Sequence, residues 1–266
     1  MKDEALSIVA DVHDPGRKLN LLREYLQSCA LRSLHESEAF LNLSFVGGTA
    51  LRFLFNLPRF SEDLDFSLEA PDGYDGERWM KKLKTDFELA GFETGIRWNS
   101  KTTVHKAWLR VGEILHDTGL AAMREQKLSI KLEIDTRPPA GAACQRTIVT
   151  RHRILALQHH DLPSLFAGKI HALMTRGYPK GRDWYDLLWY RGQRPRPQPN
   201  LIQLQNALDQ TQGKGAVDAE DWRTVLKVQF DSLDVTALAE DVAPFLERPS
   251  EAALLSRDNI CSLLQS

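Results

Sequence analysis

The chain has 266 residues, of which 42% are hydrophobic and 26% are charged. This composition is typical of a folded globular protein and excludes a largely disordered chain. The net charge of −2 at pH 7 argues against a globally basic nucleic-acid-binding protein, so contact with a polyanion requires a local basic patch.

The cysteines and the apolar runs indicate the cellular compartment of the protein. Cys29, Cys144 and Cys261 are far apart and lack metal-ligand spacing, which favours reduced thiols. The acidic N-terminus is unlike a signal peptide, and no apolar run approaches the ~20 residues of a membrane span. We therefore expect a cytoplasmic protein without a membrane segment.

The first predicted helix covers residues 17–36, where leucines recur at helical spacing. Packing against a catalytic core is its simplest role, and binding to a partner is the alternative. A short apolar strand follows at residues 44–46, and helical spacing returns over residues 49–56. Gly47 and Gly48 between them permit a tight turn. Such a turn can approach a phosphate closely, and the free N–H groups of a helix start attract anions.

Paired carboxylates follow this glycine turn. Residues 61–68 alternate polar and apolar side chains, so Asp63 and Asp65 point to one face of a predicted strand. Two carboxylates on one face suit Mg²⁺, which prefers hard oxygen ligands. Either feature alone is commonly just a turn or a solvated strand face. Together they are typical of nucleotidyl or phosphoryl transfer with metal ions.

The middle of the chain predicts a helix over residues 75–90 and strands at 92–98, 103–111 and 128–135. Lysines off the apolar stripe of the helix form a solvated face or contact nucleic-acid phosphates. In the last strand, Glu133 and Asp135 point to the same side. Short strands are expected near 147–150 and 154–157. The adjacent His159 and His160 make a poor metal pair and are interpreted as a polar turn.

A helix is predicted after Asp161, which with Pro163 has the chemistry of a helix start. Lys169 interrupts its apolar surface, as a snorkelling side chain commonly does. In the following G-R-D-W-Y-D-L segment, Asp183 and Asp186 lie on one face if helical, where acids also stabilise a first turn. A proline-rich linker follows Tyr190. Helical segments are then expected at 200–211, 219–232, 236–247 and 250–264, with Trp222, Phe230 and Phe245 as core residues.

These motifs carry a resemblance to a known family. GGTALRFLF followed by R-F-S-E-D-L-D-F-S resembles the first two motifs of the AbiEii/AbiGii-type nucleotidyltransferases, the toxins of type IV toxin–antitoxin systems in the DNA polymerase β-like superfamily. Lys169, the basic loop after it and G-R-D-W-Y-D-L resemble the later motifs. The resemblance implies an α+β fold with an α/β core, in which helices flank a mixed polymerase β-like sheet. It places a nucleotidyltransferase core with an N-terminal helix at residues 1–160. A mainly helical domain at 161–266 contributes Lys169 and Asp183 to the cleft.

The resemblance also implies roles for individual residues. The third acid of the family's metal site matches Glu133. Asp135 is the alternative, although it could instead cap the turn in T-R-P-P. Many superfamily members have serine after the glycine where this chain has Gly48 and then Thr49, which leaves the role of the hydroxyl open. The predicted metal ligands are Asp63, Asp65 and Glu133. The predicted catalytic residues are Asp63, Asp65, Lys169 and Asp183. The predicted nucleotide-binding residues are Gly47, Gly48, Thr49, Arg59, Ser61, Lys169 and Arg182.

The implied activity is transfer of a nucleoside monophosphate from an NTP to an acceptor hydroxyl. The resemblance implies Mg²⁺ as cofactor, with Mn²⁺ as an alternative, and a cognate antitoxin as partner. The expected acceptor is the 3′ end of tRNA. Two other functions stay open: nucleotidylation of a protein or small molecule, and nucleotide or RNA binding without catalysis.

Overall fold

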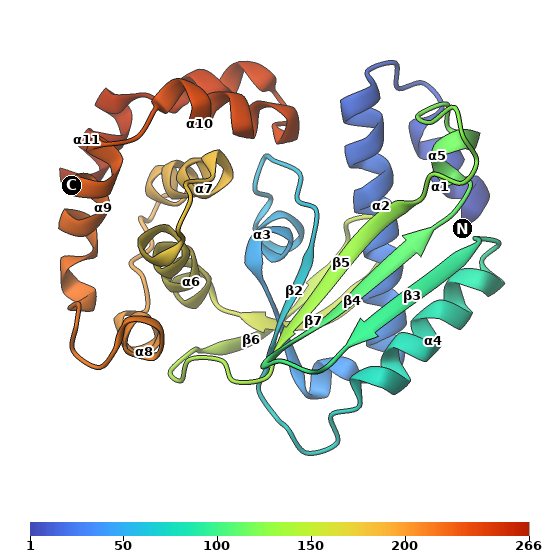
Figure 1. Cartoon of the computed structure of the whole chain (residues 1–266), viewed down its shortest axis with the longest axis horizontal. Helices are drawn as coiled ribbons and strands as arrows, with labels where there is room; N and C mark the ends of the chain where they lie inside the picture. The colour runs from blue at the N-terminus through green and yellow to red at the C-terminus, as the bar shows by residue number, and fades with distance from the viewer. Residues whose placement is uncertain (266) are drawn as a thin grey trace. The chain divides into compact units, whose positions relative to one another are not determined.

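The computed structural model describes residues 1–265, which divide into two compact units (Figure 1). The first unit comprises Met1–Asn56, Phe60–Pro138 and Gln145–His159. The second comprises Leu57–Arg59, Pro139–Cys144 and the chain from His160 onward. The functional division expected from the sequence, a catalytic core at 1–160 and a contributing helical domain at 161–266, stays a prediction.

A mixed seven-stranded sheet forms the centre of the first unit, with strand order β3-β4-β5-β2-β1-β7-β6. β2 pairs parallel with β5, and β1 pairs parallel with β7. The pairs β1–β2, β3–β4 and β4–β5 are antiparallel. This arrangement confirms the mixed sheet expected of the fold class. The strands are β1 (Leu43–Val46), β2 (Leu64–Leu68), β3 (Thr94–Asn99), β4 (Val104–Val111), β5 (Leu128–Asp135), β6 (Cys144–Val149) and β7 (Leu155–His160).

The end of β7 differs from the sequence-based expectation. His159 and His160 were expected in a polar turn, but both belong to the strand and both are buried. His159 pairs in register with Phe45 of β1, and its Nε2 lies 2.8 Å from Thr147 Oγ1. The turn interpretation is therefore wrong, because strand pairing satisfies these polar groups inside the protein.

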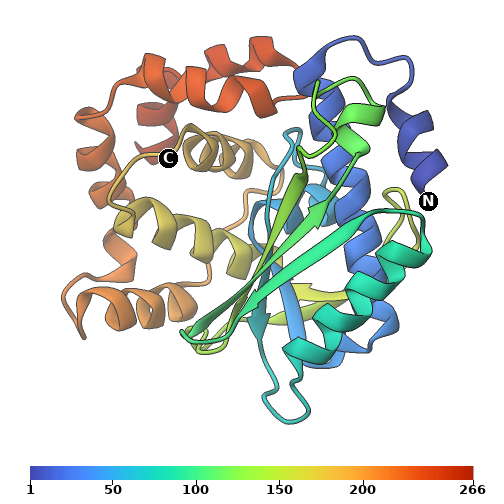
Figure 2. The same cartoon turned by 45° about the vertical axis from the view of Figure 1, so that its right-hand side comes forward.

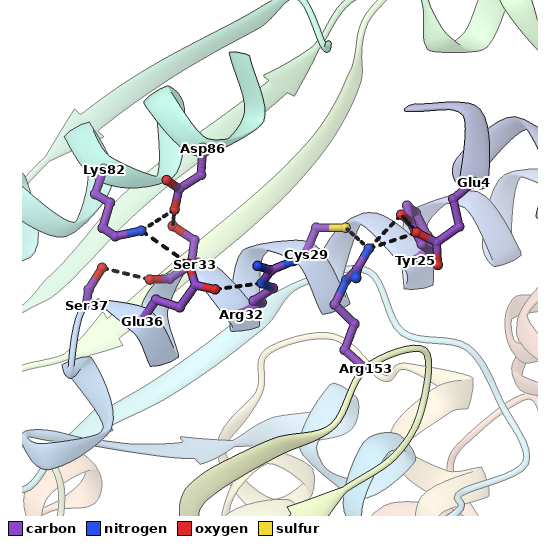
Figure 3. Close-up of polar contacts among 10 residues, drawn as sticks. All are labelled: Glu4, Tyr25, Cys29, Arg32, Ser33, Glu36, Ser37, Lys82, Asp86 and Arg153. Atoms are coloured by element: carbon purple, nitrogen blue, oxygen red, sulfur yellow. Dashed lines mark hydrogen bonds and ion pairs between the residues drawn. The ribbon is translucent and has the colours of Figure 1, made fainter. Parts of the chain in front are cut away.

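Helices α2 and α4 pack beside one another against one face of this sheet (Figures 1 and 2). Figure 3 shows polar contacts that join them: Ser33 donates to Asp86 at 2.6 Å, and Lys82 Nζ lies 2.5 Å from the same carboxylate oxygen. The predicted lysine face of α4 is thus largely paired with neighbouring acids. The helices of this unit are α1 (Lys2–Val9), α2 (Pro15–Glu36), α3 (Gly47–Phe55), α4 (Gly76–Leu89) and α5 (Ile114–Asp117), with a short 3₁₀ turn, η1 (Ala39–Leu41).

A buried carboxylate on α2 fixes the position of α3. Glu24 accepts a short hydrogen bond from Arg52 Nε of α3, and the side chains of both residues are almost fully buried. His152 Nε2 lies 2.9 Å from its other oxygen, and Arg151 approaches at 3.4 Å. The next residue, Arg153, reaches Glu4 and Tyr25 (Figure 3). The loop after β6 therefore holds α1, α2 and α3 together through charge pairs.

Glu24 makes the stability of the protein depend on pH. Burial by itself raises the pKa of this carboxyl, but His152, Arg52 and Arg151 outweigh burial and lower the pKa to about 2. The unfolded value is about 4.3. The carboxylate therefore stabilises the fold above about pH 4, and this contribution is lost as the pH falls through about 2. We expect Glu24→Gln to lower the free energy of unfolding by about 3 kcal/mol near neutral pH.

Urea unfolding of both proteins near neutral pH and at about pH 3 measures this contribution. Other carboxylates titrate equally in the two proteins, so the difference between them isolates Glu24. The difference in unfolding free energy is expected to shrink at the lower pH. A difference that stays constant would contradict the assignment.

The second unit is almost entirely helical around an aromatic core. Phe166 stacks on Tyr190 with ring centroids 4.2 Å apart, and Trp222 meets Phe166 edge-on. Phe230 lies against Trp184, so the predicted core roles of Trp222 and Phe230 are confirmed. Its helices are α6 (Leu162–Thr175), α7 (Gly181–Gly192), α8 (Leu201–Gln212), α9 (Trp222–Asp231), α10 (Val235–Val242) and α11 (Arg257–Gln265), with 3₁₀ turns η2 (Ala219–Asp221), η3 (Ala243–Phe245) and η4 (Pro249–Leu254).

Most local signals in this unit meet their expectations, but the helices expected at 236–247 and 250–264 are each interrupted, because α10 ends at Val242 and α11 begins only at Arg257. Asp161 caps α6 by accepting from the Ser164 N–H at 2.8 Å, and residues 193–200 form the connection expected from their prolines. Phe245 is only half-buried, which corrects its expected core role. Its ring instead supports the Arg182 guanidinium, whose carbon lies 4.2 Å from the ring centroid. Among residues 1–265, no helix combines the length and the apolarity that crossing a bilayer requires.

Candidate active site

The turn between β1 and α3 brings a carboxylate against the start of a helix. Gly47 has a φ of +78°, a conformation that favours glycine. A Cβ at this position would collide with the Oδ2 of Asp65. The N-cap residue of α3, Val46, has an apolar side chain that cannot accept a hydrogen bond. The first N–H groups of α3 are therefore suited to bind an anion beside Asp65.

Thr49 supports this turn from inside. Its side chain is buried, and its hydroxyl donates a short hydrogen bond to the backbone carbonyl of Asp63. The hydroxyl thus holds the segment that leads into β2, while the backbone N–H of Thr49 belongs to the helix start. Gln27 fixes the same segment by donating to the Ser61 carbonyl at 3.1 Å. Direct contact of Thr49 or Ser61 with a nucleotide stays a prediction.

A second carboxylate lies beside Asp65 on the neighbouring strand. Asp65 of β2 and Glu133 of β5 are register partners in a parallel pair, so their side chains point to the same face of the sheet. Both residues are half-buried. The carboxylate of Glu133 forms ion pairs with Lys131 at 2.8 Å and with Lys106 at 3.4 Å. This position therefore already attracts cations.

Asp135 has a different partner. Its Oδ1 accepts a hydrogen bond at 2.9 Å from the backbone N–H of Arg137, in the turn after β5. This is the capping arrangement considered as its alternative role. The geometry therefore favours Glu133 as the third acid.

The carboxylates of the first unit fit a divalent cation by their chemistry. Asp65 and Glu133 are adjacent across the sheet. The strand expected at residues 61–68 begins only at Leu64, so Asp63 lies in the segment just before β2 rather than on its face. Carboxylate oxygens are the ligands that Mg²⁺ prefers, and Mg²⁺ usually takes only one or two of them. Residues Asp63, Asp65 and Glu133 would hold the ion. Their assignment as metal ligands stays a prediction.

A separate charged cluster lies in the second unit, between α6 and α7. Lys169 Nζ is 3.0 Å from Asp183 Oδ1 and 2.8 Å from Asp186 Oδ2. Arg176 forms a short contact with the other oxygen of Asp183. Arg59 holds Asp186 with two hydrogen bonds of 2.6 Å. Three cations thus face two carboxylates, which leaves an excess positive charge.

The charges in this cluster stabilise one another. Burial alone would lower the pKa of Lys169, but Asp186 and Asp183 outweigh burial and raise this pKa. Burial alone would raise the pKa of Asp183, but Lys169 and Arg176 outweigh it and lower that pKa. Lys169 is therefore an ammonium at neutral pH. It is suited to neutralise phosphate charge and unsuited to remove a proton.

The predicted site residues therefore fall into two groups. The first unit contains Gly47, Gly48, Thr49, Ser61, Asp63, Asp65 and Glu133, and the second contains Arg59, Lys169, Asp183 and Arg182. Joining the groups in one cleft stays a prediction. Arg59 is buried with its donors on Asp186, so the structure gives it a protein partner that the sequence did not indicate. Nothing in the local pattern predicts a pair separated by 127 residues.

Comparison with protein-family models shows which family the chain belongs to. The sequence model described as "Nucleotidyl transferase AbiEii toxin, Type IV TA system" matches residues 29–257. The chain belongs to this family. It is therefore an AbiEii nucleotidyltransferase, the toxin of a type IV toxin–antitoxin system, for which the family implies an antitoxin partner. Nucleotidyltransferases generally use an NTP and a divalent metal ion.

Solved structures support the same fold for this AbiEii nucleotidyltransferase. A protein from H. pylori provisionally assigned as a nucleotidyltransferase has 18% identity and a TM-score of 0.54, with 92% of this chain and 94% of that chain covered. JHP933 from Helicobacter pylori has 18% identity and a TM-score of 0.51, with 92% of each chain covered. No curated protein matches the sequence.

Proposed function

We propose that this AbiEii nucleotidyltransferase transfers a nucleoside monophosphate from an NTP to the 3′ hydroxyl of tRNA in a Mg²⁺-dependent reaction. The observation that carries the proposal is the register pairing of Asp65 with Glu133, with Asp65 lying against Gly47 at the start of α3. Asp65 thus brings a carboxylate for a cation to the same turn as N–H donors for phosphates. This combination fits in-line attack of a hydroxyl on the α-phosphorus with release of pyrophosphate.

The first-unit residues act by binding and positioning. The N–H groups at Gly47, Gly48 and Thr49 bind oxygens of the triphosphate, and the Thr49 hydroxyl keeps the Asp63 segment in place. When bound at Asp63, Asp65 and Glu133, Mg²⁺ supplies charge neutralisation at the phosphates, and Mn²⁺ is an alternative ion. Little covalent chemistry is required of the side chains, because positioning and charge carry this reaction class.

The second-unit residues supply positive charge. Lys169 neutralises the triphosphate, and Asp183 keeps that ammonium in position through its 3.0 Å contact. Arg59 contributes indirectly, because it donates to both carboxylate oxygens of Asp186. Arg182 rests on Phe245 and is proposed to contact a phosphate with its guanidinium edge.

The basic segment around α7 favours RNA as the acceptor. Arg176, Lys180 and Arg182 lie within seven positions of one another in a chain whose net charge is −2. Such a local patch is the feature that an RNA substrate requires of a protein without a global positive charge. A tRNA acceptor and an NTP donor place the proposed activity in the cytoplasm.

Incubation of the full chain with total RNA, Mg²⁺ and each of the four labelled NTPs tests this function. The expected product is labelled tRNA, and both Asp65→Asn and a chelator should abolish it. Label on a protein or small molecule instead of RNA would support that alternative acceptor class. NTP binding without label transfer or pyrophosphate release would support a non-catalytic module. Either of these outcomes contradicts the proposal.

A further inference from the structure

A pocket of about 210 Å³ lies in the second unit beside Asp183. Its walls come from the end of α6, the loop at residues 176–180, the start of α7 and the end of α9. Pockets that enclose a drug-sized ligand commonly measure about 300–1,000 Å³. This pocket therefore suits one flat group, such as a nucleobase, with the rest of the ligand outside.

Tyr178 provides an aromatic surface at this pocket. Its side chain is 61% exposed, although a tyrosine ring usually packs into the protein. The Arg176 guanidinium lies 5.9 Å from the ring centroid and the Lys180 ammonium lies 5.5 Å from it. An exposed ring beside basic side chains is the combination by which proteins stack bases and bind the attached phosphates.

The two cations are not equivalent. Arg176 is engaged with the Asp183 carboxylate. Lys180 is half-buried, and over residues 1–265 no carboxylate lies within ion-pair distance of its ammonium. The ammonium beside Tyr178 is therefore available to an anionic ligand such as a phosphate.

Gln229 of α9 also lines this pocket. Its Nε2 donates to the Met174 carbonyl at 3.2 Å, which orients the amide. Its Oε1 is buried and accepts no hydrogen bond from any residue within 1–265. This oxygen is closed to solvent, so Gln229 contributes to the wall of the pocket and offers no exposed acceptor.

We propose that this pocket holds a nucleotide, with its base stacked on Tyr178 and a phosphate at Lys180. The proposal rests on the proposed function, because it places this nucleotide beside Asp183. The nucleotide comes either from the incoming NTP or from the 3′ end of the acceptor RNA. Both present the same base and phosphate, so separate binding experiments distinguish them.

The test measures binding without turnover in the full chain. One arm titrates each of the four NTPs with Mg²⁺ and no RNA, and the other titrates a short single-stranded RNA ending in CCA with no NTP. We expect Tyr178→Ala to weaken binding about 5- to 100-fold in one of the two arms. Tyr178→Phe keeps the ring and is expected to stay within about twofold of the original chain. The arm that responds identifies the source of the nucleotide.

Two lysine variants test the phosphate contact. If RNA is the occupant, Lys180→Gln should weaken binding and lower the slope of log affinity against log salt by about one. If an NTP is the occupant, Lys180→Gln should weaken NTP binding. Lys214→Gln removes an exposed lysine outside the pocket and should change neither RNA binding nor NTP binding.

Unchanged binding of Tyr178→Ala in both arms would overturn the proposal. Equal losses in Tyr178→Ala and Tyr178→Phe would also overturn it, because the hydroxyl rather than the stacked ring would then bind. The exposed position of Tyr178 allows its replacement without loss of core packing, which thermal unfolding of each variant checks. A transfer assay without product would contradict the proposed function and leave these binding results intact.

Discussion

Replacement of Asp65 by asparagine is expected to reduce nucleotidyl transfer at least about 100-fold. The carboxylate lies against the Gly47 turn and beside Glu133, so the change removes a negative charge from the centre of the proposed cation site. Asparagine has nearly the same shape, and Asp65 is only half-buried, so the fold should persist. Initial rates with labelled NTP and RNA, together with thermal unfolding, measure the two effects separately.

Two matched variants of the neighbouring strand sharpen this prediction. Glu133→Gln should cause a loss of similar size, because Glu133 is the register partner of Asp65. Asp135→Asn should retain activity within about threefold, a change in the barrier of no more than about 0.7 kcal/mol, because Asp135 caps the turn at Arg137. The reverse result, with loss in Asp135→Asn alone, would transfer the third ligand position to Asp135.

Replacement of Asp186 by asparagine is expected to lower the free energy of unfolding by about 3–5 kcal/mol. Asp186 is fully buried and holds Arg59 through two bonds of 2.6 Å and Lys169 at 2.8 Å. Without its negative charge, two buried cations share the single carboxylate of Asp183. Urea unfolding monitored by tryptophan fluorescence measures the loss, because Trp184 and Trp222 lie in the same unit.

An exposed aspartate in the second unit serves as the matched control. Asp231 lies 4.0 Å from Arg257, and both side chains are more than half exposed. Asp231→Asn should change the unfolding free energy by less than about 0.5 kcal/mol. Comparable losses of unfolding free energy in the two variants would contradict the prediction that the buried charge of Asp186 stabilises the fold more than an exposed charge does.

The sequence predicts the elements with strong periodicity and those with clear start and stop signals. β5 occupies residues 128–135 as expected, because its alternating side chains match a strand with one buried face. α3 begins at the glycine pair, and α6 begins after its Asp161 cap. Alternation also places Glu133 and Asp135 on one side, but only the register with Asp65 and the bond to Arg137 separate their roles.

Long-range pairing is what the sequence does not reveal. The contacts of Arg59 with Asp186 and of Glu24 with Arg151 and His152 join residues more than one hundred positions apart. Such pairs follow from tertiary packing and leave no local period. The same limit explains His159 and His160, whose burial depends on the pairing of β7 with β1. The pocket at Tyr178 likewise depends on α9 packing near the α6–α7 loop.

Transfer to the 3′ hydroxyl of tRNA is tested most directly by comparing intact tRNA with tRNA whose 3′ diol has been oxidised by periodate. Both are incubated with the full chain, Mg²⁺ and labelled NTP, and Asp65→Asn provides the background. Label is expected on intact tRNA and none on oxidised tRNA, because the 3′ hydroxyl is the proposed acceptor. Equal label on both RNAs, or no label on either, would contradict the proposal.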